Sequence, residues 1–110
     1  MLNKINLIEY FEKGIKSDTE LKIGTEHEKF ILNKSTLKPL SYDENNGIRD
    51  IFLSLIELGW KPIYEGKNKL IVGLMNGQQN ISLEPAGQFE LSGQPLENIY
   101  QTCDEITKHL

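Results

Sequence analysis

Two segments of this 110-residue chain carry paired carboxylates in patterns that could bind a metal ion. Glu26 and Glu28 lie in an extended segment, residues 20–32, and because strand side chains alternate between faces, both point the same way. Glu84 and Glu90 flank a Pro-Ala-Gly bend in residues 81–93. Hard cations such as Mg²⁺ or Mn²⁺ prefer oxygen ligands. The pattern indicates a carboxylate metal site on an antiparallel sheet, with phosphoryl transfer as one chemistry it could serve.

Other kinds of site find less support. The sequence contains no P-loop, no dinucleotide fingerprint and no cysteine-histidine cluster for zinc. His27 and His109 lie far apart in the sequence and lack a neighbouring nucleophile, so we favour a structural role for His27. The alternative for the acidic residues is a solvated edge strand guarded by charges. From the residue pattern alone, we favour this alternative for residues 20–32.

Composition indicates one globular domain over residues 1–110. The chain is 38% hydrophobic and 25% charged, and its net charge of -4 offers no electrostatic argument for a nucleic acid or anionic membrane partner. No window approaches the ~20 apolar residues of a transmembrane helix. Arg49 is the one arginine among 12 basic residues. Since arginine is preferred for bidentate phosphate recognition, most arginines of a nucleotide site would lie outside this chain.

The single cysteine, Cys103, permits no internal disulfide and fits a reducing compartment. The N-terminal residues also lack the long apolar core of a secretory signal peptide. We therefore expect a cytoplasmic protein.

Three helices are expected from apolar spacing. The first covers residues 3–15, and the second runs from a capping-box signature at Ser41 and Glu44 to about Leu58, with Gly59 ending it. The third opens at Pro95. Its apolar stripe consists of Leu96, Ile99, Cys103, Ile106 and Leu110. In that stripe Cys103 is expected to be a small buried hydrophobe.

Strands are expected over residues 60–64, 70–75, 78–84 and 88–92, in addition to 20–32. Asn76-Gly77 is a hairpin signal that predicts a type I′ turn with Met75 paired to Gln78. One face of that hairpin is apolar and the other carries Glu84 with Asn80 and Ser82. The apolar face consists of Leu70, Val72, Leu74, Ile81 and Leu83. Short connections between these strands favour an α+β domain with antiparallel pairing.

Residues 23–30 (IGTEHEKF) closely resemble the first active-site strand of glutamate–cysteine ligases of plants and many proteobacteria. Residues 81–93 (ISLEPAGQFELSG) resemble the second signature of that family. Residues 72–74 and 77–78, together with residues 101–103, Glu105 and residues 109–110, also fit. The resemblance extends from about Leu21 through the remainder of the chain.

The resemblance implies a glutamine-synthetase-like catalytic domain, of which this chain would be the N-terminal part with an incomplete antiparallel sheet. The family activity is an ATP-dependent ligation of the γ-carboxylate of glutamate to cysteine through an acyl phosphate, the first step of glutathione biosynthesis. Mg²⁺ or Mn²⁺ and ATP would be required. By resemblance, the metal ligands would be Glu26, Glu28, Glu84 and Glu90. Residues lining the glutamate or the metal-bound waters would be Thr25, Gln88 and Ser92.

Some features depart from the family. Tyr100 stands where the family often has histidine and Ala86 where it often has glycine, while family members are several times longer than this chain. We therefore expect a fragment that is inactive alone. Two alternatives remain open: a non-catalytic module that binds a metal or an amino acid, and one subunit of a split enzyme with a C-terminal partner chain.

Overall fold

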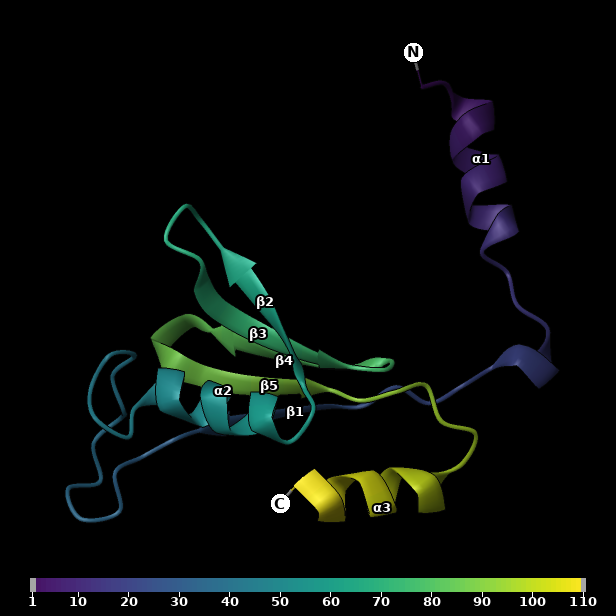
Figure 1. Cartoon of the computed structure of the whole chain (residues 1–110). Coiled ribbons are helices and arrows are strands. Elements are labelled where there is room, and N and C mark those ends of the chain that lie inside the picture. Colours follow the sequence, from purple (N-terminus) through teal and green to yellow (C-terminus); the bar gives the residue numbers. More distant parts are fainter. Residues whose placement is uncertain (1, 110) are drawn as a thin grey trace.

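The computed structural model describes residues 2–109, which form three α-helices and one five-stranded antiparallel sheet (Figure 1). The helices are α1 (Lys4–Lys13), α2 (Ile48–Glu57) and α3 (Ile99–His109). The strands are β1 (Glu26–Phe30), β2 (Lys61–Glu65), β3 (Leu70–Asn76), β4 (Gln79–Glu84) and β5 (Gln88–Ser92), in the spatial order β1-β5-β4-β3-β2. The expected α+β class with antiparallel pairing is confirmed.

The first strand is shorter than predicted and pairs far along the chain. Regular pairing covers only β1, and the expected strand over residues 20–32 otherwise survives as isolated bridges from Ile23 to Leu96 and from Leu32 to Pro39. β1 lies beside β5, with Glu28 opposite Glu90. This contact joins the two acidic segments that the sequence analysis singled out.

The β3–β4 hairpin forms, but the predicted register is wrong. Asn76 pairs with Gln79 and Leu74 with Ile81, so the loop residues are Gly77 and Gln78. Only the first of these has a positive φ, +63° at Gly77, which is the glycine position of a type II′ turn rather than type I′. Because the pairing shifts by one residue on each strand, Leu74 and Ile81 still share the apolar face.

A β-bulge changes the predicted apolar face of β3. Ile63 pairs with Gly73 but Tyr64 pairs with Ile71, so Val72 is the extra residue on its strand. A bulge reverses the alternation beyond it. Ile71 therefore enters the core, where it is 7% exposed, and the prediction that Val72 would do so is wrong.

The core lies between α2 and one face of the sheet. Phe52 of α2 is fully buried, and its ring centroid lies 4.9 Å from that of Phe89 on β5. The remaining buried apolar side chains of this cluster are Ile48, Ile71, Leu74, Ile81 and Leu91. The central strands therefore direct one set of alternating side chains toward α2, and the other set lies on the opposite face of the sheet, which α2 does not cover.

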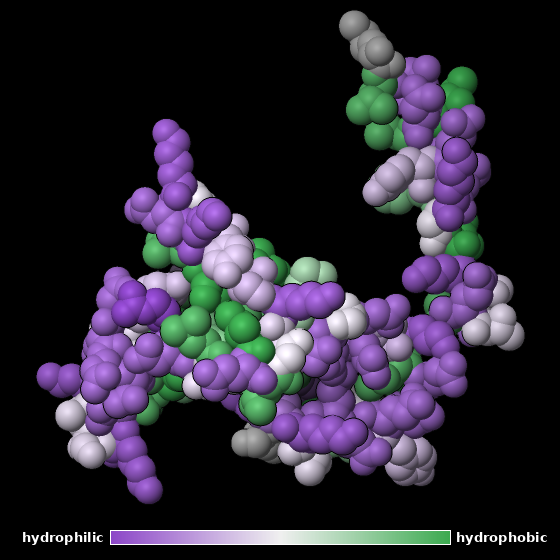
Figure 2. All heavy atoms as spheres, viewed as in Figure 1, coloured by the Kyte–Doolittle hydropathy of each residue, from purple (hydrophilic) through white to green (hydrophobic). Residues whose placement is uncertain are grey.

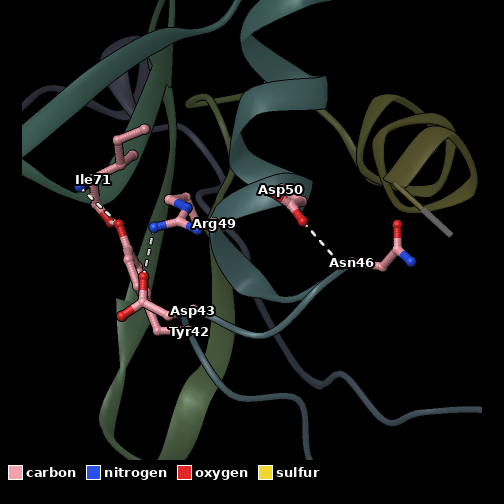
Figure 3. A network of polar contacts seen from close by, with 6 residues as sticks. All are labelled: Tyr42, Asp43, Asn46, Arg49, Asp50 and Ile71. Atoms are coloured by element: carbon pink, nitrogen blue, oxygen red, sulfur yellow. Dashed lines mark hydrogen bonds and ion pairs between the residues drawn. The ribbon is translucent and has the colours of Figure 1, made fainter.

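The loop before α2 is held by polar contacts, shown in Figure 3. The Tyr42 hydroxyl donates to the carbonyl of Ile71 and accepts from its N–H, both at 2.9 Å. Arg49 is surface-exposed and donates to Asp43 at 2.6 Å, in keeping with the position predicted off the apolar stripe.

The predicted capping box at Ser41 and Glu44 is wrong, because α2 begins at Ile48 with Gly47 as its N-cap. The carbonyl of Ser41 instead accepts from the backbone N–H of Ile48. A Cβ at position 47 would lie 2.5 Å from that carbonyl oxygen, so the close approach requires glycine. The predicted end of the helix is confirmed, with Gly59 at φ +100°.

The first helix extends away from the sheet, as Figure 1 shows. Asn3 caps it reciprocally with Asn6. Its expected packing face has no partner within residues 2–109, and its apolar side chains are visible on the surface in Figure 2. The exposed apolar residues at this end of the chain include Ile5, Ile8, Phe11 and Ile15.

The third helix presents a different face to the sheet from the one predicted. It begins at Ile99 rather than Pro95, and Thr102 and Glu105 are its buried residues. Ile99 and Cys103 are exposed, so the expectation of a buried cysteine is wrong. Leu110, the last residue of the predicted stripe, lies outside the described residues. Within residues 2–109, no helix is both long enough and apolar enough to cross a membrane.

Candidate metal and substrate site

The four predicted metal ligands lie on one face of the sheet, opposite α2. On β5, Phe89 and Leu91 enter the core, so Glu90 between them points to the other side. The same alternation places Glu26 and Glu28 on the more exposed face of β1. Glu84 follows two residues after Ser82, the partner of Glu90 on β4. Tertiary structure thus gathers on three adjacent strands the carboxylates of two segments about 60 residues apart.

Glu90 occupies the centre of this carboxylate face. It pairs with Glu28 of β1 on one side and with Ser82 of β4 on the other. Desolvation raises the pKa of Glu90 above its usual value, and the negative charges of Glu26, Glu84 and Glu28 raise it further. The carboxylates are therefore close enough to repel one another.

Positive side chains do not offset this charge. Among residues 2–109, the ion pairs are Lys22–Glu97 and Arg49–Asp43, and neither includes a member of the carboxylate face. Oxygen-rich, negatively charged surfaces of this kind suit hard divalent cations. In the described part of the chain, however, no three His, Cys, Asp or Glu side chains converge closely enough to hold one ion. The carboxylate face has suitable donors and charge, and its ligand role stays a prediction.

Two of the predicted substrate-binding residues accompany these glutamates. The Gln88 side-chain amide donates to Glu28 across the β1–β5 pair. Ser92 stands opposite Glu26, and its hydroxyl lies 3.5 Å from a carboxylate oxygen of Glu90. Both residues can orient the carboxylates, and both retain polar atoms that could contact a ligand.

Thr25 is not part of this group. Its hydroxyl donates to Glu105 of α3 at 3.0 Å, on the side of the sheet that faces the helices. Two residues that were not predicted as site residues do lie on the carboxylate face, because Asn80 and Ser82 pair with Ser92 and Glu90. The sequence signal for these two residues was their alternation with the apolar Ile81. The pairing of β4 with β5 places them beside the predicted metal ligands.

The bend between β4 and β5 sets the position of the last two members. Pro85–Gly87 forms one short 3₁₀ turn, in which Ala86 has φ +63° and Gly87 φ +75°. A non-glycine residue in this left-handed region costs on the order of 1–2 kcal/mol. The bend nevertheless brings Gln88 opposite Glu84, so the tight connection keeps both on the carboxylate face.

A separate concavity lies on the other side of the sheet. A cavity of about 770 Å³ opens on the helix side, between α2 and α3. Its lining combines apolar residues such as Leu55, Trp60 and Leu96 with Glu105 and Lys108. Because the sheet separates this cavity from the carboxylate face, it is not the predicted metal site.

Comparison with known proteins supports the resemblance noted in the sequence. The family model described as glutamate-cysteine ligase family 2 matches residues 22–110. Glutamate–cysteine ligase A, chloroplastic, of Oryza sativa subsp. japonica is 49% identical over 110 residues, which are 99% of this chain and 21% of that protein. The chloroplastic enzymes of Brassica juncea and Arabidopsis thaliana are 47% and 46% identical, over 99% of this chain and 20% of each relative.

The chain spans about a fifth of the length of these relatives. Their names also show that the expectation of a cytoplasmic protein is wrong, since each is described as chloroplastic. The physical reason is that a missing apolar signal core argues only against secretion. Transit peptides for plastids are rich in arginine and serine and are not recognised by hydrophobicity. By its family match and its similarity to these enzymes, the chain belongs to glutamate-cysteine ligase family 2.

Proposed function

We propose that this chain supplies the carboxylate side of the metal–ATP site in an ATP-dependent ligase that joins the γ-carboxylate of glutamate to the amine of cysteine. The supporting observation is the carboxylate face, where three glutamates raise the pKa of Glu90 and where, within residues 2–109, neither ion pair includes any of the four. The chain belongs to a family whose relatives are named glutamate–cysteine ligases, and this supports metal binding as the role of that negative charge.

The proposed ligands are Glu26, Glu28, Glu84 and Glu90. Divalent Mg²⁺ or Mn²⁺ bound there would neutralise the phosphates of ATP and draw them toward a negatively charged surface that otherwise repels them. Gln88 donates to Glu28 and would hold that carboxylate in place. Ser92 and the neighbouring Asn80 would contact the metal-bound waters or the carboxylate of substrate glutamate.

The proposed reaction has two steps. An oxygen of the γ-carboxylate of glutamate attacks the γ-phosphorus of ATP, so that ADP leaves and an acyl phosphate forms. The amine of cysteine then attacks the acyl carbon, loses a proton, and expels inorganic phosphate to give γ-glutamylcysteine. Both steps crowd negative charge together, which is why the site needs cations between the acidic protein surface and the substrates.

The chain supplies only part of such a site. Its single arginine, Arg49, is paired with Asp43 beside α2 and does not face the carboxylates. Recognition of the ATP phosphates by arginine would therefore come from a further segment, consistent with a chain that spans a fifth of its relatives. We propose that residues 1–110 act as one N-terminal domain of the ligase and are inactive without the remainder.

The test is ADP release with Mg²⁺, ATP, glutamate and cysteine, measured for this chain alone and after addition of a polypeptide that carries the remaining part of a plant relative. We expect no release alone and release dependent on both amino acids after addition. Glu26→Gln and Glu84→Gln should abolish the restored activity with the fold intact. Glu65→Gln, on β2 of the same sheet, is the matched control and should leave it unchanged. Full activity in Glu26→Gln or Glu84→Gln would remove that residue from the metal site.

A second candidate function is a non-catalytic module that binds a metal or an amino acid beside a partner chain. The exposed apolar side chains of α1 favour this alternative, because large exposed apolar surfaces mark interaction sites. Mn²⁺ binding in a chain that never supports ADP release, even with the complementary polypeptide, would favour the module over the ligase.

A further inference from the structure

Glu105 is a buried carboxylate that the proposed chemistry does not use. It lies on α3 and is 8% exposed, on the side of the sheet away from the carboxylate face. Burial alone would raise the pKa of Glu105, but hydrogen bonds from Gln79, Thr25 and Gln94, together with the charge of His27, outweigh it and lower that pKa. A buried ionised carboxylate is stable only when its oxygens are satisfied in this way.

The three donors come from three separate segments of the chain. The Thr25 hydroxyl donates to Oε1 at 3.0 Å, while the Gln79 side chain and the backbone N–H of Gln94 donate to Oε2 at 2.8 and 3.1 Å. Thr25 immediately precedes β1, Gln79 begins β4, and Gln94 follows the end of β5. These are the three strands that carry the predicted metal ligands.

The hydrogen bonds to Glu105 all gather at one end of the three strands. At that end the backbone N–H of Gly93 donates to the carbonyl of Thr25 at 2.8 Å, and Glu26 pairs with Ser92. A Cβ at Gly93 would lie 2.0 Å from Oε1 of Glu105, so only glycine at this position leaves room for the carboxylate. Glu105 therefore connects α3 to the ends of all three strands.

We propose that Glu105 is a positioning residue for the carboxylate face: by binding the ends of β1, β4 and β5 together, it sets where Glu26 lies relative to Glu90. This inference rests on the proposed function, because the value of that position is metal binding. Glu105 itself touches neither metal nor substrate in this scheme. It acts through Thr25, whose backbone continues directly into Glu26.

The donor arrangement requires a polar acceptor at position 105. Both oxygens accept, and a glutamine at position 105 would offer one acceptor and one amide group. That amide would face either the Thr25 hydroxyl or the N–H groups of Gln79 and Gln94. A hydroxyl can accept from an amide, whereas two N–H donors cannot satisfy each other. Glu105→Gln can therefore keep all three contacts by turning its amide toward Thr25, whereas Glu105→Leu has a similar volume and removes every acceptor.

The experiment measures Mn²⁺ binding to the 110-residue chain by EPR, at a temperature where urea titration shows every variant to be folded. We expect Glu105→Leu to bind Mn²⁺ about 10-fold more weakly, within the range for residues that orient metal ligands. Glu105→Gln, which can keep the three contacts, should recover most of that loss. Gly93→Ala should act like Glu105→Leu by displacing the carboxylate, and the double variant should be no weaker than either single one. Thr25→Val removes one donor and should give a smaller loss.

Two controls separate positioning from general destabilisation. Glu97→Gln changes an exposed glutamate near the same helix and should leave Mn²⁺ affinity unchanged. Phe52→Leu weakens the core from α2 and should lower the free energy of unfolding without changing the affinity. Equal affinities of Glu105→Leu and the unmodified chain would overturn the inference.

A second readout does not depend on metal. In NMR spectra, Glu105→Leu should lose the cross-strand contact between Glu26 and Ser92 and the exchange protection of the Gly93 N–H. Retention of both would refute the positioning role even if Mn²⁺ affinity fell. If the unmodified chain binds no Mn²⁺ at all, the proposed function fails, and these NMR signals alone decide whether Glu105 positions β1.

Discussion

Replacement of Phe52 by alanine tests whether α2 packs on the sheet through this side chain. Phe52 is fully buried and packs against Phe89, whose neighbours along β5 are Gln88 and Glu90. Phe→Ala changes in cores cost about 3–5 kcal/mol. Because domains of this size are stable by about 5–15 kcal/mol, the variant should lose a large part of its stability.

The assay is urea unfolding followed by circular dichroism, with Leu53→Ala as the matched control. Leu53 is the next residue of α2 and is 46% exposed, so its truncation should change the free energy of unfolding by no more than about 0.5 kcal/mol. The two variants therefore differ by roughly 2.5–4.5 kcal/mol, taken from the core and surface ranges. Similar losses in both would show that α2 does not pack on the sheet through Phe52.

Three further predictions concern charge and close contacts. Glu90→Gln should raise the urea midpoint of the metal-free chain at pH 7. Desolvation and the neighbouring carboxylates raise the Glu90 pKa, so stability is lost as pH rises through that pKa. The same variant should gain less stability from Mn²⁺ than the unmodified chain, and an equal gain would contradict a ligand role. Desolvation and the charges of Lys29 and His27 lower the pKa of His109, so the contribution of His109 to stability should decline as pH falls below 6.5. The slope should be at most ~1.4 kcal/mol per pH unit. His109→Gln should therefore weaken the pH dependence of the urea midpoint between pH 7.5 and 5.5. Gly73→Ala would place Cβ 2.7 Å from the Ile81 carbonyl on the paired strand, so it should lower thermal stability, whereas Gly66→Ala, with open space around it, should cost only the strain of its positive φ.

The polar and apolar alternation along β4 and β5 was readable in advance. Ile81, Phe89 and Leu91 mark one face, and this places Glu84 and Glu90 on the other. Alternation is a property of the extended backbone itself, which is why it survived the error in the hairpin register. The turn type was misjudged because Asn76-Gly77 suits two turn geometries, and pairing with β5 and β2 contributes to the choice.

The third helix shows where periodicity failed. Its apolar stripe predicted Cys103 as buried, but Thr102 and Glu105 face the sheet instead. The spacing of apolar residues cannot show that three polar donors from distant segments form hydrogen bonds with the single carboxylate of Glu105. In the same way, a capping-box pattern at Ser41 could not show that Tyr42 would bind Ile71 or that α2 would begin at Ile48 with Gly47 as its N-cap.

The sequence by itself determined the family, the α+β class and the identity of the acidic residues, because these follow from local motifs and from the two-residue period of strands. Only the tertiary structure decided that Glu28 lies opposite Glu90, that Thr25 belongs to Glu105 rather than to the carboxylate face, and that α3 turns its polar side inward. Each of these depends on contacts between residues 11 to 80 positions apart. Such contacts are chosen by the packing and hydrogen bonding of the whole domain, which no local pattern encodes.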